Sequence, residues 1–87
     1  MGLDTVELVL AVEEAFDIQI PNTIAEKLLT VGELHEFVIA ELIRCGRAKV
    51  DRNEVYDILR NLICSQFGVR PEEVIPTARF VEDLRAD

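Results

Sequence analysis

Apolar residues recur at spacings of three and four in three segments of this chain, and this pattern most constrains its fold. The first segment runs from Leu3 to Phe16 and stops before Ile18-Gln-Ile-Pro, because a proline disfavours the helical conformation in the residue before it. The second covers about 32–44 and the third about 54–68. Such spacings place apolar side chains along one face of a helix. The sequence therefore predicts three amphipathic helices.

Residues with capping chemistry lie between the first two of these segments. Asn22 is expected to cap a short helix over 23–29, since its side chain can accept hydrogen bonds from free backbone N–H groups. Thr30 and Glu33 have the spacing of a capping box, in which each side chain bonds the backbone N–H of the other. A helix is therefore expected to begin immediately after Thr30.

The third amphipathic helix also has start and stop signals. Asp51 or Asn53 is expected to cap its beginning, and Gly68 to end it in a left-handed conformation. The tail at 69–87 contains a short Pro-Glu-Glu-Val turn. Five apolar residues of the tail are expected to pack on the helices: Val74, Ile75, Phe80, Val81 and Leu84. The prediction is an all-α bundle of three main helices and one short helix.

The length of 87 residues allows one modest hydrophobic core, so we expect a single domain over 1–87. The apolar runs are only a few residues long, too short to cross a membrane. The N-terminus also lacks the pattern of a signal peptide. We therefore expect a cytoplasmic protein with no membrane insertion.

The net charge of −8 comes entirely from the first half of the chain. Residues 1–43 contain nine acidic residues and one basic residue, Lys27, whereas 44–87 contain eight of each kind. A nucleic-acid backbone would be repelled by the acidic half, so nucleic acid is not expected as a partner. A basic protein surface would be attracted to it.

The residues that most often carry catalysis or metal binding are few and scattered. Cys45 and Cys64 lack any motif of metal ligands and are expected to be reduced thiols. His35 is the single histidine and is expected to face solvent beside Glu36. The sequence contains no nucleophile–base pair and no phosphate-binding loop, so an enzyme is not expected.

Two long stretches resemble a known family. LDTVELVLAVEEAFDIQIP, followed by AEKLLTV, resembles the C-terminal half of a bacterial acyl carrier protein, and EVYDILRNLICSQFGVRPEEVIPTARFVEDLRAD resembles the N-terminal half. The two halves occur here in reversed order. The resemblance implies a circularly permuted acyl-carrier bundle, with 1–43 matching the family's C-terminal half and 54–87 its N-terminal half.

Residues 44–53 would then be the connector between the family's last and first helices. Fully extended, these ten residues reach about 33 Å, roughly the length of a small domain. If the connector were helical instead, the helices on both sides could merge into one rod and exchange halves between two chains. A monomer and a domain-swapped dimer therefore both remain open.

The resemblance also implies a missing attachment site. Members of the family carry 4′-phosphopantetheine on the serine of an Asp-Ser-Leu triad, and the matching Asp and Leu here are Asp87 and Leu3. Gly2 occupies the serine position and has no hydroxyl, so no cofactor is expected for this chain as written. Ser65 and Thr5 lie in contexts that do not match the triad.

The family's acidic helix is the surface that basic, acyl-chain-processing enzymes recognise. The matching partner-binding residues are Asp4, Glu7, Glu13, Glu14 and Asp87, although a merely solvated face is the alternative. The family also shelters acyl chains between its helices. The candidate lining residues are Leu3, Val6, Leu10, Leu42, Ile75 and Phe80, for which an ordinary core is the stronger interpretation.

Two functional hypotheses follow from the resemblance. The first is a carrier-like module of fatty-acid or related acyl metabolism that is not phosphopantetheinylated and acts by protein–protein recognition. The alternative is a functional carrier in a permuted, truncated or engineered form, whose serine-bearing version carries acyl thioesters. The two hypotheses differ at Gly2.

Overall fold

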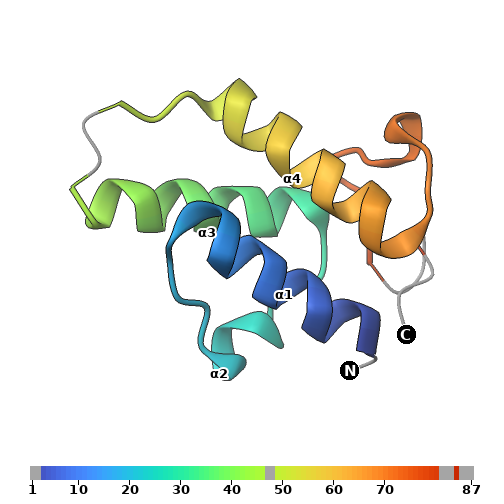
Figure 1. The fold of residues 1–87 in the computed structure, drawn as a ribbon, viewed down its shortest axis with the longest axis horizontal. Helices are drawn as coiled ribbons and strands as arrows, with labels where there is room; N and C mark the ends of the chain where they lie inside the picture. Colours follow the sequence, from blue (N-terminus) through green and yellow to red (C-terminus); the bar gives the residue numbers. More distant parts are fainter. Residues whose placement is uncertain (1–2, 47–48, 81–83, 85–87) are drawn as a thin grey trace.

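The computed structural model of this chain describes residues 3–46, 49–80 and 84, with the side chains of 3–5 excluded. Figure 1 shows α3 and α4 running in opposite directions, and α1 and α3 each pack against α4. The helical elements are α1 (Leu3–Phe16), α2 (Asn22–Ala25), α3 (Val31–Arg44), α4 (Arg52–Phe67) and the 3-10 turn η1 (Pro71–Glu73). The predicted all-α bundle of three main helices and one short helix is confirmed.

The boundaries of α1 agree with the prediction, but those of α2 do not. The first helix stops at Phe16, and Asp17 turns the chain with a φ of 54°. The short helix covers only Asn22–Ala25, so the prediction of 23–29 was wrong. Its N-cap is Pro21, and no side chain caps it. Beyond Ala25 the α-helical bonding stops, because the Lys27 and Leu28 N–H groups donate to carbonyls three residues back and the Leu29 N–H donates to the Glu33 carboxylate at 2.9 Å.

The predicted capping box at the start of α3 is confirmed. The Thr30 hydroxyl accepts a hydrogen bond from the Glu33 N–H at 3.2 Å, and the Glu33 carboxylate accepts one from the Thr30 N–H at 3.0 Å. The same carboxylate also accepts the Leu29 N–H at 2.9 Å. This carboxylate therefore satisfies backbone donors at the helix start and in the residue before it.

Of the two candidate caps for α4, the structure uses Asp51. Its carboxylate accepts hydrogen bonds from the Asn53 and Glu54 N–H groups at 2.9 and 3.2 Å, and the helix begins at Arg52. Gly68 ends the helix with a φ of 66°, as predicted. The helices on either side of the connector are separate in the structure and do not merge into a rod.

The buried side chains form one cluster that draws on both halves of the chain. Leu8, Val12, Leu59 and Ile63 lie at its centre and exclude water almost completely. Burying each of these side chains stabilises the fold by roughly 1.5–3 kcal/mol before entropy is counted.

The tail contributes to this core with one exception. Val74, Phe80 and Leu84 are buried as predicted. Ile75 is 49% exposed, so its predicted packing was wrong. The turn that returns the chain toward α3 explains this, because the Ile75 carbonyl accepts the Ala78 N–H at 2.9 Å. Val81 lies outside the described residues.

Backbone hydrogen bonds join the two halves of the chain between residues 29–32 and 76–80, a contact we call the inter-half bridge. The Val31 N–H donates to the Ala78 carbonyl at 3.0 Å, and the Gly32 N–H donates to the Pro76 carbonyl at 2.8 Å. A Cβ on Gly32 would lie 2.9 Å from that Pro76 oxygen, so the close approach requires glycine. The bridge fixes the tail against the first turn of α3.

Candidate functional site

The outer face of α1 combines apolar and acidic side chains. Its inner face buries Leu8, Val12 and Phe16, which are spaced four residues apart. On the outer face, Val6 is 40% and Leu10 57% exposed. Two acidic residues beside them are also exposed, Glu7 and Glu14. We call Val6, Glu7, Leu10 and Glu14 the α1 outer face.

The predicted partner-binding acids occupy different environments. Glu7 accepts a hydrogen bond from the Gln66 side chain at 3.2 Å, which links α1 to the last turns of α4. Glu13 is half-buried, and its carboxylate accepts the Ile20 N–H at 2.7 Å. It therefore fixes the loop after α1, a role that the sequence pattern did not reveal. The Asp4 side chain and all of Asp87 lie outside the described residues.

The six candidate acyl-pocket residues are also distributed over different environments. Leu42 and Phe80 are buried in the common core, where Phe80 packs edge-to-face on Phe67 with ring centres 6.2 Å apart. Val6, Leu10 and Ile75 are exposed, and the side chain of Leu3 is not described. The two buried residues are therefore part of the ordinary core, and the three exposed residues lie on the surface.

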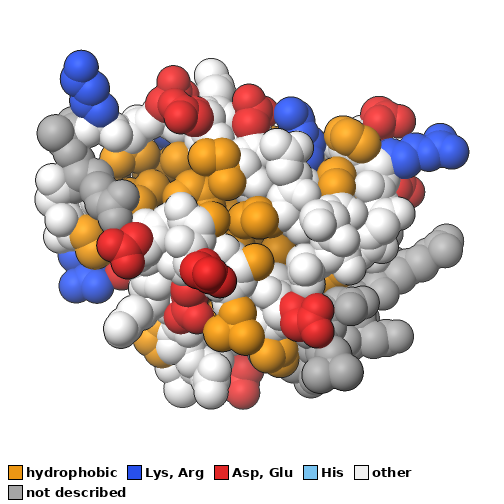
Figure 2. Space-filling view, in the orientation of Figure 1, with side chains coloured by type: hydrophobic (Ala, Val, Ile, Leu, Met, Phe, Trp, Pro, Cys, Tyr) orange, Lys and Arg blue, Asp and Glu red, His pale blue; other side chains and the backbone are white. Residues whose placement is uncertain are grey.

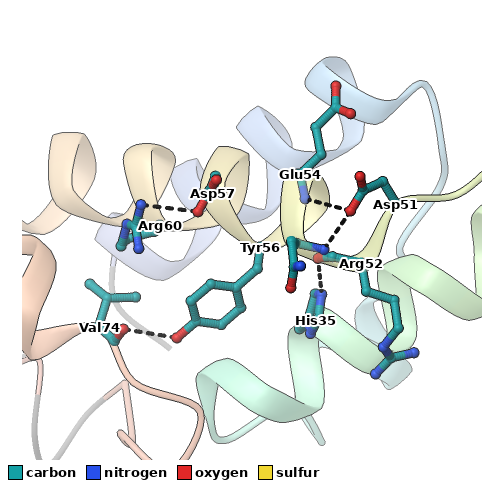
Figure 3. Close-up of polar contacts among 9 residues, drawn as sticks. His35, Asp51, Arg52, Glu54, Tyr56, Asp57, Arg60 and Val74 are labelled. Carbon is teal, nitrogen blue, oxygen red and sulfur yellow. Dashed lines mark hydrogen bonds and ion pairs between the residues drawn. The ribbon is translucent and has the colours of Figure 1, made fainter.

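His35 was expected to face solvent, and the structure instead places it in a half-buried contact (Figure 3). Its Nε2 lies 3.0 Å from the Arg52 carbonyl oxygen. Because a carbonyl oxygen can only accept, this nitrogen carries the hydrogen and donates the hydrogen bond. The imidazole also meets the Tyr56 ring edge-on, with ring centres 5.2 Å apart. The physical reason is that α4 begins beside α3, a proximity that residues so distant in sequence do not reveal.

Tyr56 extends this contact to the tail. Its hydroxyl donates a hydrogen bond to the Val74 carbonyl at 2.8 Å, and burial raises the pKa of the phenol. Arg52 adds an ion pair with Glu36 of α3 on the surface nearby. The histidine, the tyrosine and the arginine therefore hold α3, α4 and the tail together, which is a structural role.

The thiols differ in exposure. Cys45 is exposed and Cys64 half-buried, and neither forms a disulfide. Burial raises the pKa of the Cys64 thiol, which lowers its reactivity. Within residues 3–46, 49–80 and 84, no group of three or more His, Cys, Asp or Glu side chains could hold a metal ion. In the same part of the chain, the helices are too short or too polar to cross a membrane.

The expected attachment position precedes α1. Gly2 and Asp87 lie outside the described residues, but the helix start at Leu3 follows directly in sequence. A helix start can bind phosphate through its free N–H groups. A phosphodiester also requires a hydroxyl, which glycine lacks, so 4′-phosphopantetheine does not fit this chain at that position. Ser65 is exposed on α4, far from α1's start in sequence.

The curated relatives that this chain matches include two named acyl carrier protein. The one from Prochlorococcus marinus is 59% identical over 40 residues, which cover 46% of this chain and 50% of the relative. The one from Picosynechococcus sp. is 71% identical over 32 residues, which cover 37% of this chain and 40% of the relative. The chain resembles acyl carrier proteins.

This chain spans at most about half the length of the curated relatives it matches. No protein-family model matches it, and no solved structure matches it. The resemblance predicted from the sequence is thus confirmed for part of the chain. The reversed order of the halves and the loss of the serine stay predictions.

Proposed function

We propose that this chain is a carrier-like recognition module that docks on basic surfaces of acyl-chain-processing enzymes. The observation that carries this proposal is the α1 outer face. Two apolar side chains, Val6 and Leu10, remain exposed there on the same helix face as the carboxylates of Glu7 and Glu14. Burying exposed apolar residues gives a partner a source of affinity, and the carboxylates select basic partners.

Charge and apolar contact would play different parts in this docking. The net charge of −8 attracts a basic enzyme over a distance and speeds association. Each exposed ion pair contributes only about 0–1 kcal/mol, so the carboxylates set orientation more than affinity. Leu10, which is 57% exposed, is the side chain that can lose the most water-accessible surface on this face.

We further propose that the module is not charged with 4′-phosphopantetheine, because Gly2 has no hydroxyl to attack coenzyme A. It would act in the cytoplasm, within fatty-acid or related acyl metabolism. The alternative is a carrier whose serine-bearing version holds acyl thioesters. The similarity to acyl carrier proteins supports this second hypothesis.

Intact mass separates these two hypotheses. The chain and its Gly2→Ser variant are each incubated with coenzyme A and a broad-specificity phosphopantetheinyl transferase. An uncharged module predicts no gain of mass for the chain itself. A gain for Gly2→Ser would show that the surrounding surface is still recognised, whereas a gain for the unaltered chain would contradict the assigned attachment position.

Recognition is tested with matched pairs of variants against the same transferase, immobilised for binding measurements. Leu10→Ala should weaken binding, whereas Ile43→Ala, which changes a 61% exposed residue of α3, should not. Glu14→Lys should weaken binding more than Glu26→Lys, because both residues are exposed acids but only Glu14 lies on the α1 outer face. Equal effects within both pairs would refute docking through this face.

A further inference from the structure

A second surface feature lies where the connector meets the helices, at the end of α1 and the start of α4. It is a groove of about 200 Å³ that we call the connector groove. Its lining residues are Ala15, Phe16, Leu42, Lys49, Val50, Asp51, Glu54, Val55 and Ile58. None of these belongs to the α1 outer face, so the groove is a separate surface.

The floor of the groove is apolar and pre-formed. Phe16, Leu42 and Val55 are buried core residues whose side chains close its base. Ala15 and Ile58 are exposed and stand at its mouth. Figure 2 shows hydrophobic side chains gathered on this face of the molecule, with acidic side chains around them. A ligand would therefore find an apolar patch of core residues next to polar lining groups, with no rearrangement of the core.

Within the lining of this groove, acidic residues outnumber basic ones. Asp51 and Glu54 line it from the start of α4. Lys49 contributes the positive charge of the lining. The Asp51 carboxylate also caps α4, where it accepts hydrogen bonds from two backbone N–H groups.

The size of the groove fits one aromatic side chain. A cavity of about 150 Å³ holds a benzene molecule, so about 200 Å³ accommodates a phenyl ring. A second copy of this chain is disfavoured, because two molecules of charge −8 repel one another. The same charge disfavours a nucleic acid or an anionic membrane as the occupant.

We propose that the connector groove docks a segment of a partner protein that carries one aromatic side chain flanked by lysine or arginine residues. The aromatic ring enters the apolar part of the groove, and the flanking cations lie against Glu54 and Asp51. This is the usual arrangement of a buried anchor surrounded by polar contacts. The proposal does not depend on whether the α1 outer face also binds a partner.

The test uses two capped pentapeptides of equal charge, Lys-Lys-Phe-Lys-Lys and Lys-Lys-Ala-Lys-Lys, titrated into the ¹⁵N-labelled chain. We expect the phenylalanine peptide to bind at least about tenfold more tightly, since burying a phenyl ring accounts for that ratio. The amide signals that shift most should be those of Ala15, Val50 and Ile58. Equal affinities for the two peptides would overturn the proposal.

Two variants check the position of the ring. Ala15→Trp fills the mouth of the groove and should remove the preference for phenylalanine, while Ala40→Trp, which also changes an exposed helical alanine, should leave it intact. Far-UV circular dichroism confirms that both variants are folded. Because Ala15→Trp could alter the groove in other ways, Ile58→Ser provides a second variant and should reduce the preference several-fold.

The charge argument has its own control. Lys49→Gln should strengthen binding of both peptides, and Glu54→Gln should weaken both by a similar factor. Signal shifts centred on Val6 and Leu10 would place the peptide on the α1 outer face and refute docking in the groove. Concentration-dependent shifts without any peptide, together with a dimer in sedimentation, would show that a second copy occupies it and would equally refute the proposal.

Discussion

Removal of the Glu33 carboxylate tests the joint between the two halves of the chain. One carboxylate oxygen of Glu33 accepts the N–H groups of Leu29 and Thr30 at 2.9 and 3.0 Å and lies 3.3 Å from the Thr30 hydroxyl. The same stretch of backbone carries the inter-half bridge. Glu33→Ala therefore removes half of a capping box and frees two backbone donors beside a tertiary contact.

The expected loss is about 1–2 kcal/mol of unfolding free energy. A lost cap costs about 0.5–2 kcal/mol. Water can reach the freed donors because this contact is exposed, so the full penalty of burying unpaired groups does not apply. The higher helix propensity of alanine offsets at most about 0.5 kcal/mol. For a domain of this size, the midpoint of thermal unfolding should fall by roughly 5–15 °C.

The assay is thermal and urea unfolding of three variants followed by circular dichroism. Glu26→Ala removes an exposed acid that takes no part in the capping box and should change stability by less than about 0.5 kcal/mol. Glu33→Gln keeps an oxygen acceptor and should lose less than Glu33→Ala. The reasoning is refuted if Glu33→Ala and Glu26→Ala unfold at the same temperature.

Four further measurements test other parts of the structure. Leu59→Ala deletes a fully buried side chain and should cost about 2–5 kcal/mol in urea unfolding. Gly68→Ala places a side chain at a φ of 66° and should cost about 1–2 kcal/mol, with Gly68→Asn costing less. The pKa of Tyr56 is raised in the fold, so stability should fall as pH rises from about 10 through the folded pKa, and Tyr56→Phe should remove this fall in pH-dependent unfolding. Iodoacetamide should label Cys45 before Cys64, and equal rates would contradict the burial of the latter.

The features that sequence predicted well are those decided by nearby residues. The capping box of Thr30 and Glu33, the cap by Asp51 and the left-handed Gly68 each depend on side chains within three positions of the backbone they bond or on the residue itself. The periodicity of α1 predicted a helix but not its buried face, because Leu8 is buried whereas Val6 and Leu10 are exposed. These local preferences agree with the final fold, so reading them required no tertiary information.

The features that sequence missed depend on distant parts of the chain. Beyond the short helix α2, the Leu29 carbonyl accepts a hydrogen bond from the Phe80 N–H, a tertiary contact that no local pattern predicts. His35 is half-buried because α4 begins beside it, and Glu13 bonds the loop that follows a left-handed residue. For the candidate site, the sequence supplied the acids of α1 but could not separate a carboxylate engaged by backbone from an exposed one.

The inter-half bridge has a consequence for how this chain reaches its fold. Helical bundles usually fold fast because most of their contacts are between residues near in sequence. Here the tail must return to the first turn of α3, and α1 must meet a side chain of α4 that is 59 residues away. Closing such large loops costs conformational entropy before the new contacts can stabilise the chain. The docking of one half on the other is therefore expected to limit the folding rate.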